Sequence, residues 1–187
     1  MMVSIIAYLK KTNFLKVFLL FCFFSEQIFA GEIFIKDISF KKNKKISYLI
    51  LNHDVNFSGD ALLALNKGIP IRIRMSLKIK EKNKFWLDKE IFSEDKFYQL
   101  RYRNLFNKYQ LNFNGEKTIY LDNIDDIKSK LYNLEWNLGE INLSDTSEVN
   151  LIIGLDQSKL PKSLLINLND ESWDMKVVLN KSYKELF

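Results

Sequence analysis

The chain is poor in the side chains that many catalytic and metal centres use. Its 187 residues include one cysteine, Cys22, and one histidine, His53. A Ser-His-Asp or Cys-His nucleophile needs a histidine in a defined constellation, and a zinc site needs several Cys and His ligands at short spacing. The sequence therefore predicts neither kind of centre.

Glycine and proline are also scarce, with six and two residues. We find no glycine-rich phosphate loop, no internal repeat and no low-complexity linker. The sequence accordingly predicts no cofactor, and its length fits one domain with a targeting segment.

Positive charge is present in only modest excess. Of the formal net charge of +5, residues 1–30 supply +2 through three lysines and one glutamate, which leaves +3 for the rest. Nucleic-acid-binding domains usually concentrate basic residues on one face, whereas here acids are interleaved. We therefore predict no nucleic-acid partner. The lysine-rich stretch KKNKK, residues 41–45, is interpreted as a solvated loop.

The first thirty residues have the order of a secretory signal peptide. Lys10, Lys11 and Lys16 precede an apolar run at 17–24, and a polar stretch ends at Ala30. A spanning helix needs roughly twenty apolar residues, and this run is much shorter. The sequence predicts residues 1–30 as a signal peptide and 31–187 as a single periplasmic domain without a thiol. The alternative is an uncleaved signal that anchors the domain to the inner membrane.

Alternation of apolar and polar residues dominates the rest of the chain. It is clearest at 71–80, IRIRMSLKIK, where period two predicts a strand with one buried and one wet face. Further strands are predicted at 32–40, 46–57, 117–121, 148–156 and 172–179, with a strand pair at 96–113 and a turn or short strand at 84–90. Helices are predicted at 59–67, after the capping Ser58, and at 123–136.

Short connections between these elements favour antiparallel pairing. The sequence thus predicts a mainly β domain with two helices, an antiparallel β-sandwich of about eight strands that is immunoglobulin-like or related.

Asp156 and Pro161 follow the strand at 148–156. An aspartate can hold a turn through backbone N–H groups, and proline cannot continue a sheet ladder. Asp156 is therefore interpreted as a turn residue, and no catalytic residue is predicted. Arg72, Arg74, Trp86, Arg101 and Arg103 are the candidate partner-binding residues, because aromatic and arginine side chains alternate with the core positions there.

Two motifs carry a resemblance to a known family. They are Leu155, Asp156, Ser158, Leu160 and Pro161 in LDQSKLP, and the Leu and Tyr positions of LRYRNLFNKYQL at 100–111. With the strand at 68–79, the helix and Trp173, they resemble, over about residues 32–180, a proteobacterial family of exported proteins catalogued as domain of unknown function 4390. The resemblance implies an envelope location and no particular activity.

These observations favour a non-enzymatic binding or accessory module of the cell envelope, which contacts its partner through a sheet edge or the region of Trp86. The partner would be an envelope protein or a membrane component, with membrane association through the N-terminal segment as one route. One alternative is a hydrolase or transferase that uses Asp88, Glu90 and Asp156 on an envelope substrate. Another is an accessory role beside a membrane sensor kinase.

Overall fold

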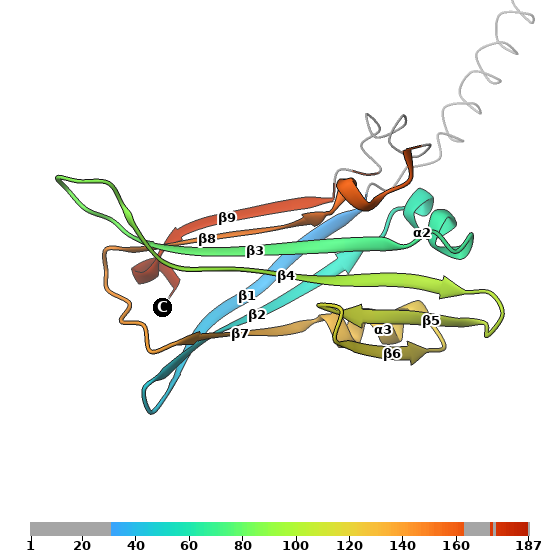
Figure 1. Cartoon of the computed structure of the whole chain (residues 1–187), viewed down its shortest axis with the longest axis horizontal. Coiled ribbons are helices and arrows are strands. Elements are labelled where there is room, and N and C mark those ends of the chain that lie inside the picture. Colours follow the sequence, from blue (N-terminus) through green and yellow to red (C-terminus); the bar gives the residue numbers. More distant parts are fainter. Residues whose placement is uncertain (1–30, 163–172, 174, 187) are drawn as a thin grey trace, which may run out of the picture.

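Two antiparallel sheets form the domain in this computed structural model, which describes residues 31–162, 173 and 175–186. The smaller sheet has the order β1-β2-β7, and the larger has the order β6-β5-β4-β3-β8-β9. Figure 1 shows the smaller sheet crossing the larger one in a sandwich-like arrangement. The predicted fold class, mainly β with two helices and antiparallel sheets, is confirmed.

The strands and helices have the following bounds. The smaller sheet contains β1 (Glu32–Asn43), β2 (Ile46–Asn56) and β7 (Asn133–Gly139). The larger sheet contains β3 (Ile71–Glu81), β4 (Lys89–Arg103), β5 (Lys108–Phe113), β6 (Lys117–Leu121), β8 (Ser147–Leu155) and β9 (Lys176–Ser182). The two helices are α2 (Gly59–Asn66) and α3 (Ile124–Leu131).

The alternation predicted for residues 71–80 is reproduced in β3, whose apolar residues are all buried while the basic ones alternate outward. Apolar residues of β2, β4, β7 and β8 meet them between the sheets, since burial of apolar surface is the main favourable term in folding. The largest fully buried side chains are Trp136, Tyr98, Leu49, Leu51, Leu65, Ile71, Ile73, Met75, Leu77, Ile79, Leu100 and Leu111.

The first predicted helix is confirmed within one residue. The Ser58 side chain accepts a hydrogen bond from the backbone N–H of Ala61 at 3.1 Å, which caps the first turn of α2. Gly68 follows the helix with a φ of 80°, a left-handed conformation that favours glycine. Neither helix, nor any other helix among the described residues, is long and apolar enough to cross a membrane.

The second predicted helix was too long. α3 ends at Leu131, and residues predicted as its last turn belong to β7. Leu134 fits helical spacing after Ile127 and Leu131, but it also begins an alternation with Trp136 and Leu138 that places two large side chains in the core. Pairing of Leu134 with Leu51 and of Trp136 with Leu49 adds β7 to the smaller sheet.

Two further boundaries differ from the prediction. The segment 84–90 is mainly a turn, and β4 begins at Lys89, so the strand predicted to start at 96 is longer. The last strand, β9, starts at Lys176, whereas its predicted start was residue 172. Residue 172 lies outside the described part of the chain. Trp173 is buried, as predicted.

Candidate functional site

The predicted arginines lie on the outer face of the larger sheet, and three of them make side-chain contacts within the chain. The guanidinium of Arg72 stacks on the ring of Phe97 at 3.6 Å and forms an ion pair with Asp156 at 3.4 Å. Arg74 pairs with Asp95, whose carboxyl pKa is lowered chiefly by that hydrogen bond. These contacts link β3 to neighbouring segments, and the assignment of Arg72 and Arg74 as partner-binding residues stays a prediction.

Arg101 and Arg103 lie further along the same face of β4. Arg101 is exposed, whereas Arg103 donates its Nε hydrogen to Gln110 on β5. The register pairs Arg72 with Gln99, so the four arginines share one face but do not converge on one point. The arrangement is an open basic strip along the sheet.

Asp156 anchors the turn that follows β8, although through different contacts from those predicted. Its Oδ1 accepts a hydrogen bond from the Ser158 hydroxyl at 2.6 Å, and its Oδ2 faces Arg72. Its own backbone N–H donates to the Arg72 carbonyl at 2.8 Å. The side chain forms no capping hydrogen bond to the short 3-10 helix that follows, Gln157–Lys159. A carboxylate already paired with a guanidinium and a hydroxyl fits a structural role.

The three carboxylates considered for an enzyme are not brought together. Glu90, which follows Asp88 by two residues, lies opposite Lys80 of β3, whereas Asp156 bonds to the backbone of Arg72 on the same strand. Arg72 and Lys80 are eight residues apart, which separates Asp156 from Glu90 by roughly 26 Å at about 3.3 Å per residue. Paired carboxylates of glycoside hydrolases lie within about 10 Å, so this trio does not form such a site.

A depression of about 500 Å³ lies on the outer face of the larger sheet. Arg74, Ser76, Gly154, Asp156 and Trp173 contribute to its lining. Arg74 and Asp156 are engaged in ion pairs, with Asp95 and Arg72. Lys176 also lines the depression and is exposed, with no ion pair among the described residues.

His53 belongs to the core rather than to a surface site. Its ring lies on the inner face of β2, 6.4 Å from the ring of Tyr98, and desolvation lowers its pKa to about 4 despite the nearby Asp54 carboxylate. Neither ring nitrogen has a hydrogen-bond partner among the described residues. The same residues contain no cluster of three or more His, Cys, Asp or Glu side chains suited to a metal ion.

Trp86 lies at a different kind of surface, the turn that joins β3 to β4. Phe85, Trp86 and Leu87 expose 87%, 82% and 93% of their surface. Asn83 shapes this turn, since its Oδ1 accepts from the backbone N–H of Phe85 at 3.2 Å and its own N–H donates to Asp88 at 3.4 Å. Figure 1 shows the turn extending beyond the rest of the larger sheet.

The end of the β1–β2 hairpin, residues 41–45, projects at the lower left of Figure 1, apart from the β3–β4 turn at the upper left. The solvated loop predicted for these residues is only partly correct, since 41–43 end β1 and only 44–45 form the turn. All five residues are called the β1–β2 turn. It carries Lys41, Lys42, Lys44 and Lys45, all exposed, with Lys44 in a left-handed conformation at a φ of 56°. None of the four forms an ion pair within the described part of the chain. We call the β1–β2 turn (41–45) and the β3–β4 turn (82–88) together the tip end.

Sequence reasoning identified Trp86 but not its neighbours Phe85 and Leu87. Three consecutive large apolar residues resemble a short buried strand when only their hydrophobicity is considered. The signal was the flanking Asn83 and Asp88, both turn formers, which bound the apolar run on each side.

The fold and this surface define a small two-sheet β domain with a basic, apolar-tipped end and no assembled catalytic group among the candidates considered. The chain belongs to the family described as domain of unknown function (DUF4390), whose model matches residues 30–181. Comparisons with curated proteins and with solved structures gave no match.

Proposed function

We propose that this protein is a non-enzymatic binding module of the cell envelope, exported to the periplasm, that contacts its partner through the β3–β4 turn. The observation that carries this function is the exposure of three consecutive large apolar side chains, Phe85, Trp86 and Leu87. A contiguous exposed apolar patch on a soluble domain marks an interaction site, whereas scattered exposed apolar residues are ordinary.

Two further features support a binding role. Of the carboxylates considered for catalysis, Asp156 lies at the other end of β3 from Asp88 and Glu90 and is engaged with Arg72. The order of lysines, apolar run and Ala30 in the first thirty residues supports export.

Site-specific photo-cross-linking in cells tests this function. A photoreactive amino acid replaces Trp86 in the full-length chain, and the same residue replaces Val178, which is 53% exposed on β9, as the control. The proposal expects adducts at position 86 and none at 178. Equal labelling at both positions, or no adduct at 86, would contradict it.

A further inference from the structure

We infer that the tip end docks on an anionic lipid surface, with the β3–β4 turn inserted among the headgroups and the β1–β2 turn held against them. This inference rests on the proposed function and names the chemistry of its partner. It combines two features that lie toward the left of Figure 1 at the ends of separate hairpins, an apolar turn and a hairpin end with four lysines.

The apolar turn has the composition of an interfacial insertion. Phe85, Trp86 and Leu87 are consecutive and exposed at the end of a hairpin, and Trp is enriched where proteins meet the membrane–water interface. Large apolar side chains bury about 150–250 Å² each, so three fall short of the roughly 800 Å² that a specific protein partner usually covers on one side. A bilayer accepts a convex tip without a complementary pocket.

Charged residues border the apolar run on both sides. Lys84 precedes it, Asp88 and Lys89 follow it, and all three are exposed. Lysine side chains beside such a tip can extend their ammonium groups to the headgroups while the apolar residues enter the boundary with the acyl chains. The arrangement fits shallow insertion of one turn rather than a deeper penetration.

The second turn supplies charge at the same end. Residues 41–45 carry four exposed lysines and no acid, without an ion pair among the described residues. Lysines close to an anionic surface each contribute about 1 kcal/mol, and the attraction decays within a Debye length of about 8 Å in physiological salt.

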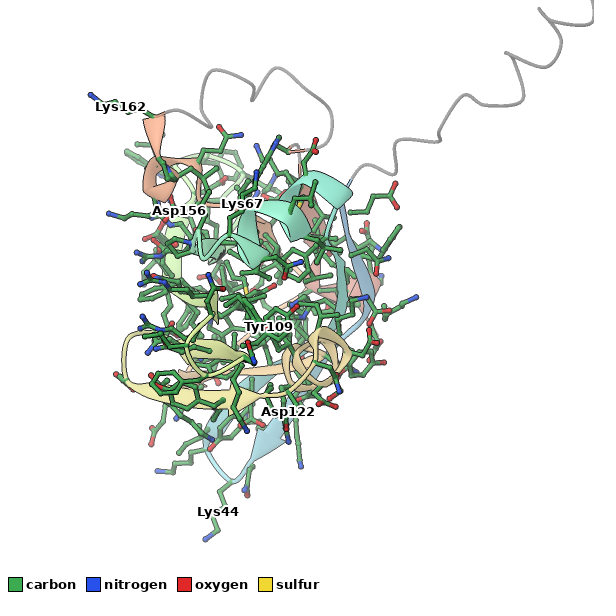
Figure 2. All side chains as sticks on the ribbon, turned by 90° about the vertical axis from the view of Figure 1, so that its right-hand side faces the viewer. Lys44, Lys67, Tyr109, Asp122, Asp156 and Lys162 are labelled. Atoms are coloured by element: carbon green, nitrogen blue, oxygen red, sulfur yellow. The ribbon has the colours of Figure 1, made fainter. Side chains whose placement is uncertain are left out.

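Stable attachment to a membrane usually takes two signals, such as an apolar insertion combined with a basic patch. The opposite end of the sheet offers a contrast. Its β4–β5 turn carries two exposed apolar residues rather than three, Leu105 at 94% and Phe106 at 66%, and the nearby Lys108 is paired with Asp122 at 3.0 Å. Figure 2 looks onto this opposite end and shows Asp122 there, with Lys44 projecting at the periphery. Leu105 therefore serves as a matched apolar control.

Tryptophan fluorescence measures the docking directly. The chain has three tryptophans, of which Trp136 and Trp173 are buried and Trp86 is exposed. Residues 31–187 contain both sheets and all the buried side chains described, so this segment has a complete core and can be tested alone. A blue shift of emission on adding vesicles would report transfer of Trp86 from water.

We expect the shift with vesicles of equal parts phosphatidylcholine and phosphatidylglycerol, with weaker binding to phosphatidylcholine alone and weaker binding in high salt. The double variant Phe85→Ser, Leu87→Ser keeps the Trp86 reporter and should bind about tenfold more weakly or worse. The variant Lys44→Gln, Lys45→Gln should lose about fivefold per lysine. Lys117 at the start of β6 and Lys130 in the last turn of α3 are exposed lysines outside the tip end. The control variants Leu105→Ser and Lys117→Gln, Lys130→Gln should bind like the wild type.

Thermal unfolding of each variant establishes that it is folded before binding is compared. Absence of a shift with phosphatidylglycerol vesicles, or equal loss in tip and control variants, would overturn the lipid assignment. If vesicles fail while position 86 still cross-links to a discrete protein in cells, the partner is a protein and the binding function stands. If both measurements fail, the proposed function fails with the lipid assignment.

Discussion

At the scale of single residues, two buried or half-buried polar groups have measurable consequences for stability. His53 lies in an apolar core with its pKa lowered to about 4 by burial, so the folded protein holds it neutral. The unfolded chain would bind a proton to this residue near its ordinary pKa of about 6.5.

We predict that His53 makes the folded domain less stable in mild acid. Its contribution is complete above pH 6.5 and is lost as the pH falls from 6.5 to 4, because the unfolded state takes up the proton first. The free energy of unfolding should fall by about 3 kcal/mol across that window. Urea titrations at several pH values measure it. His53→Leu should remove this part of the pH dependence, and an unchanged profile in that variant would contradict the assignment.

The second residue-scale prediction compares two ion pairs on the outer face. The Arg72 and Asp156 side chains are 22% and 10% exposed, while Arg74 and Asp95 are 58% and 45% exposed. Asp156→Asn should lower the free energy of unfolding by about 1–2 kcal/mol, since it leaves a half-buried guanidinium unpaired. Asp95→Asn should cost less than about 1 kcal/mol. Equal effects would contradict the structural role of Asp156.

At the scale of elements, the sequence predicted a strand correctly where its apolar residues fit the alternation of a strand and do not also fit the spacing of a helix. Ile71, Ile73 and Met75 alternate with polar residues and fit no helical spacing, so β3 was predicted almost to the residue. Leu134 fits both periods. The choice between helix and strand there depends on pairing with Leu51 across the sheet, which a local pattern does not contain.

The same limit applies to the candidate site. Trp86 could be selected as a binding residue, but whether Phe85 and Leu87 are buried or exposed depends on where the turn lies relative to the second sheet. The commitment of Arg72 to Phe97 and Asp156 likewise depends on three segments that are distant in the sequence.

A matched pair of tryptophan variants tests the assignment of β7. Trp136 is fully buried on β7, and Trp136→Ala should reduce the free energy of unfolding by about 3–5 kcal/mol. Trp86→Ala removes an exposed side chain and should change it by less than about 0.5 kcal/mol. Chemical denaturation followed by circular dichroism distinguishes the two. A small effect at position 136 would mean that β7 does not form part of the core.

At the scale of the whole molecule, β4 runs the length of the larger sheet and separates two different ends. Its fifteen residues span roughly 50 Å at about 3.3 Å per residue, from the tip end to the β4–β5 turn. Residue 31 lies at the far end from the tip, since Gly31 approaches Ser58 beside α2. Under the proposed function, the apolar and basic turns face the partner, and residue 31, the first described residue, lies at the end of the domain that faces away from it.

The central claim is that an exported domain is held at the envelope by its tip end. The most direct test is to express the full chain, with a C-terminal tag, in a Gram-negative host, separate cytosol, periplasm and membranes, and sequence the N-terminus of the recovered protein. The account predicts a chain that begins at Gly31 and sediments with the membranes, and a Phe85→Ser, Leu87→Ser variant that shifts to the soluble periplasm. Recovery from the cytosol, an uncleaved N-terminus, or identical fractionation of the two chains would contradict it.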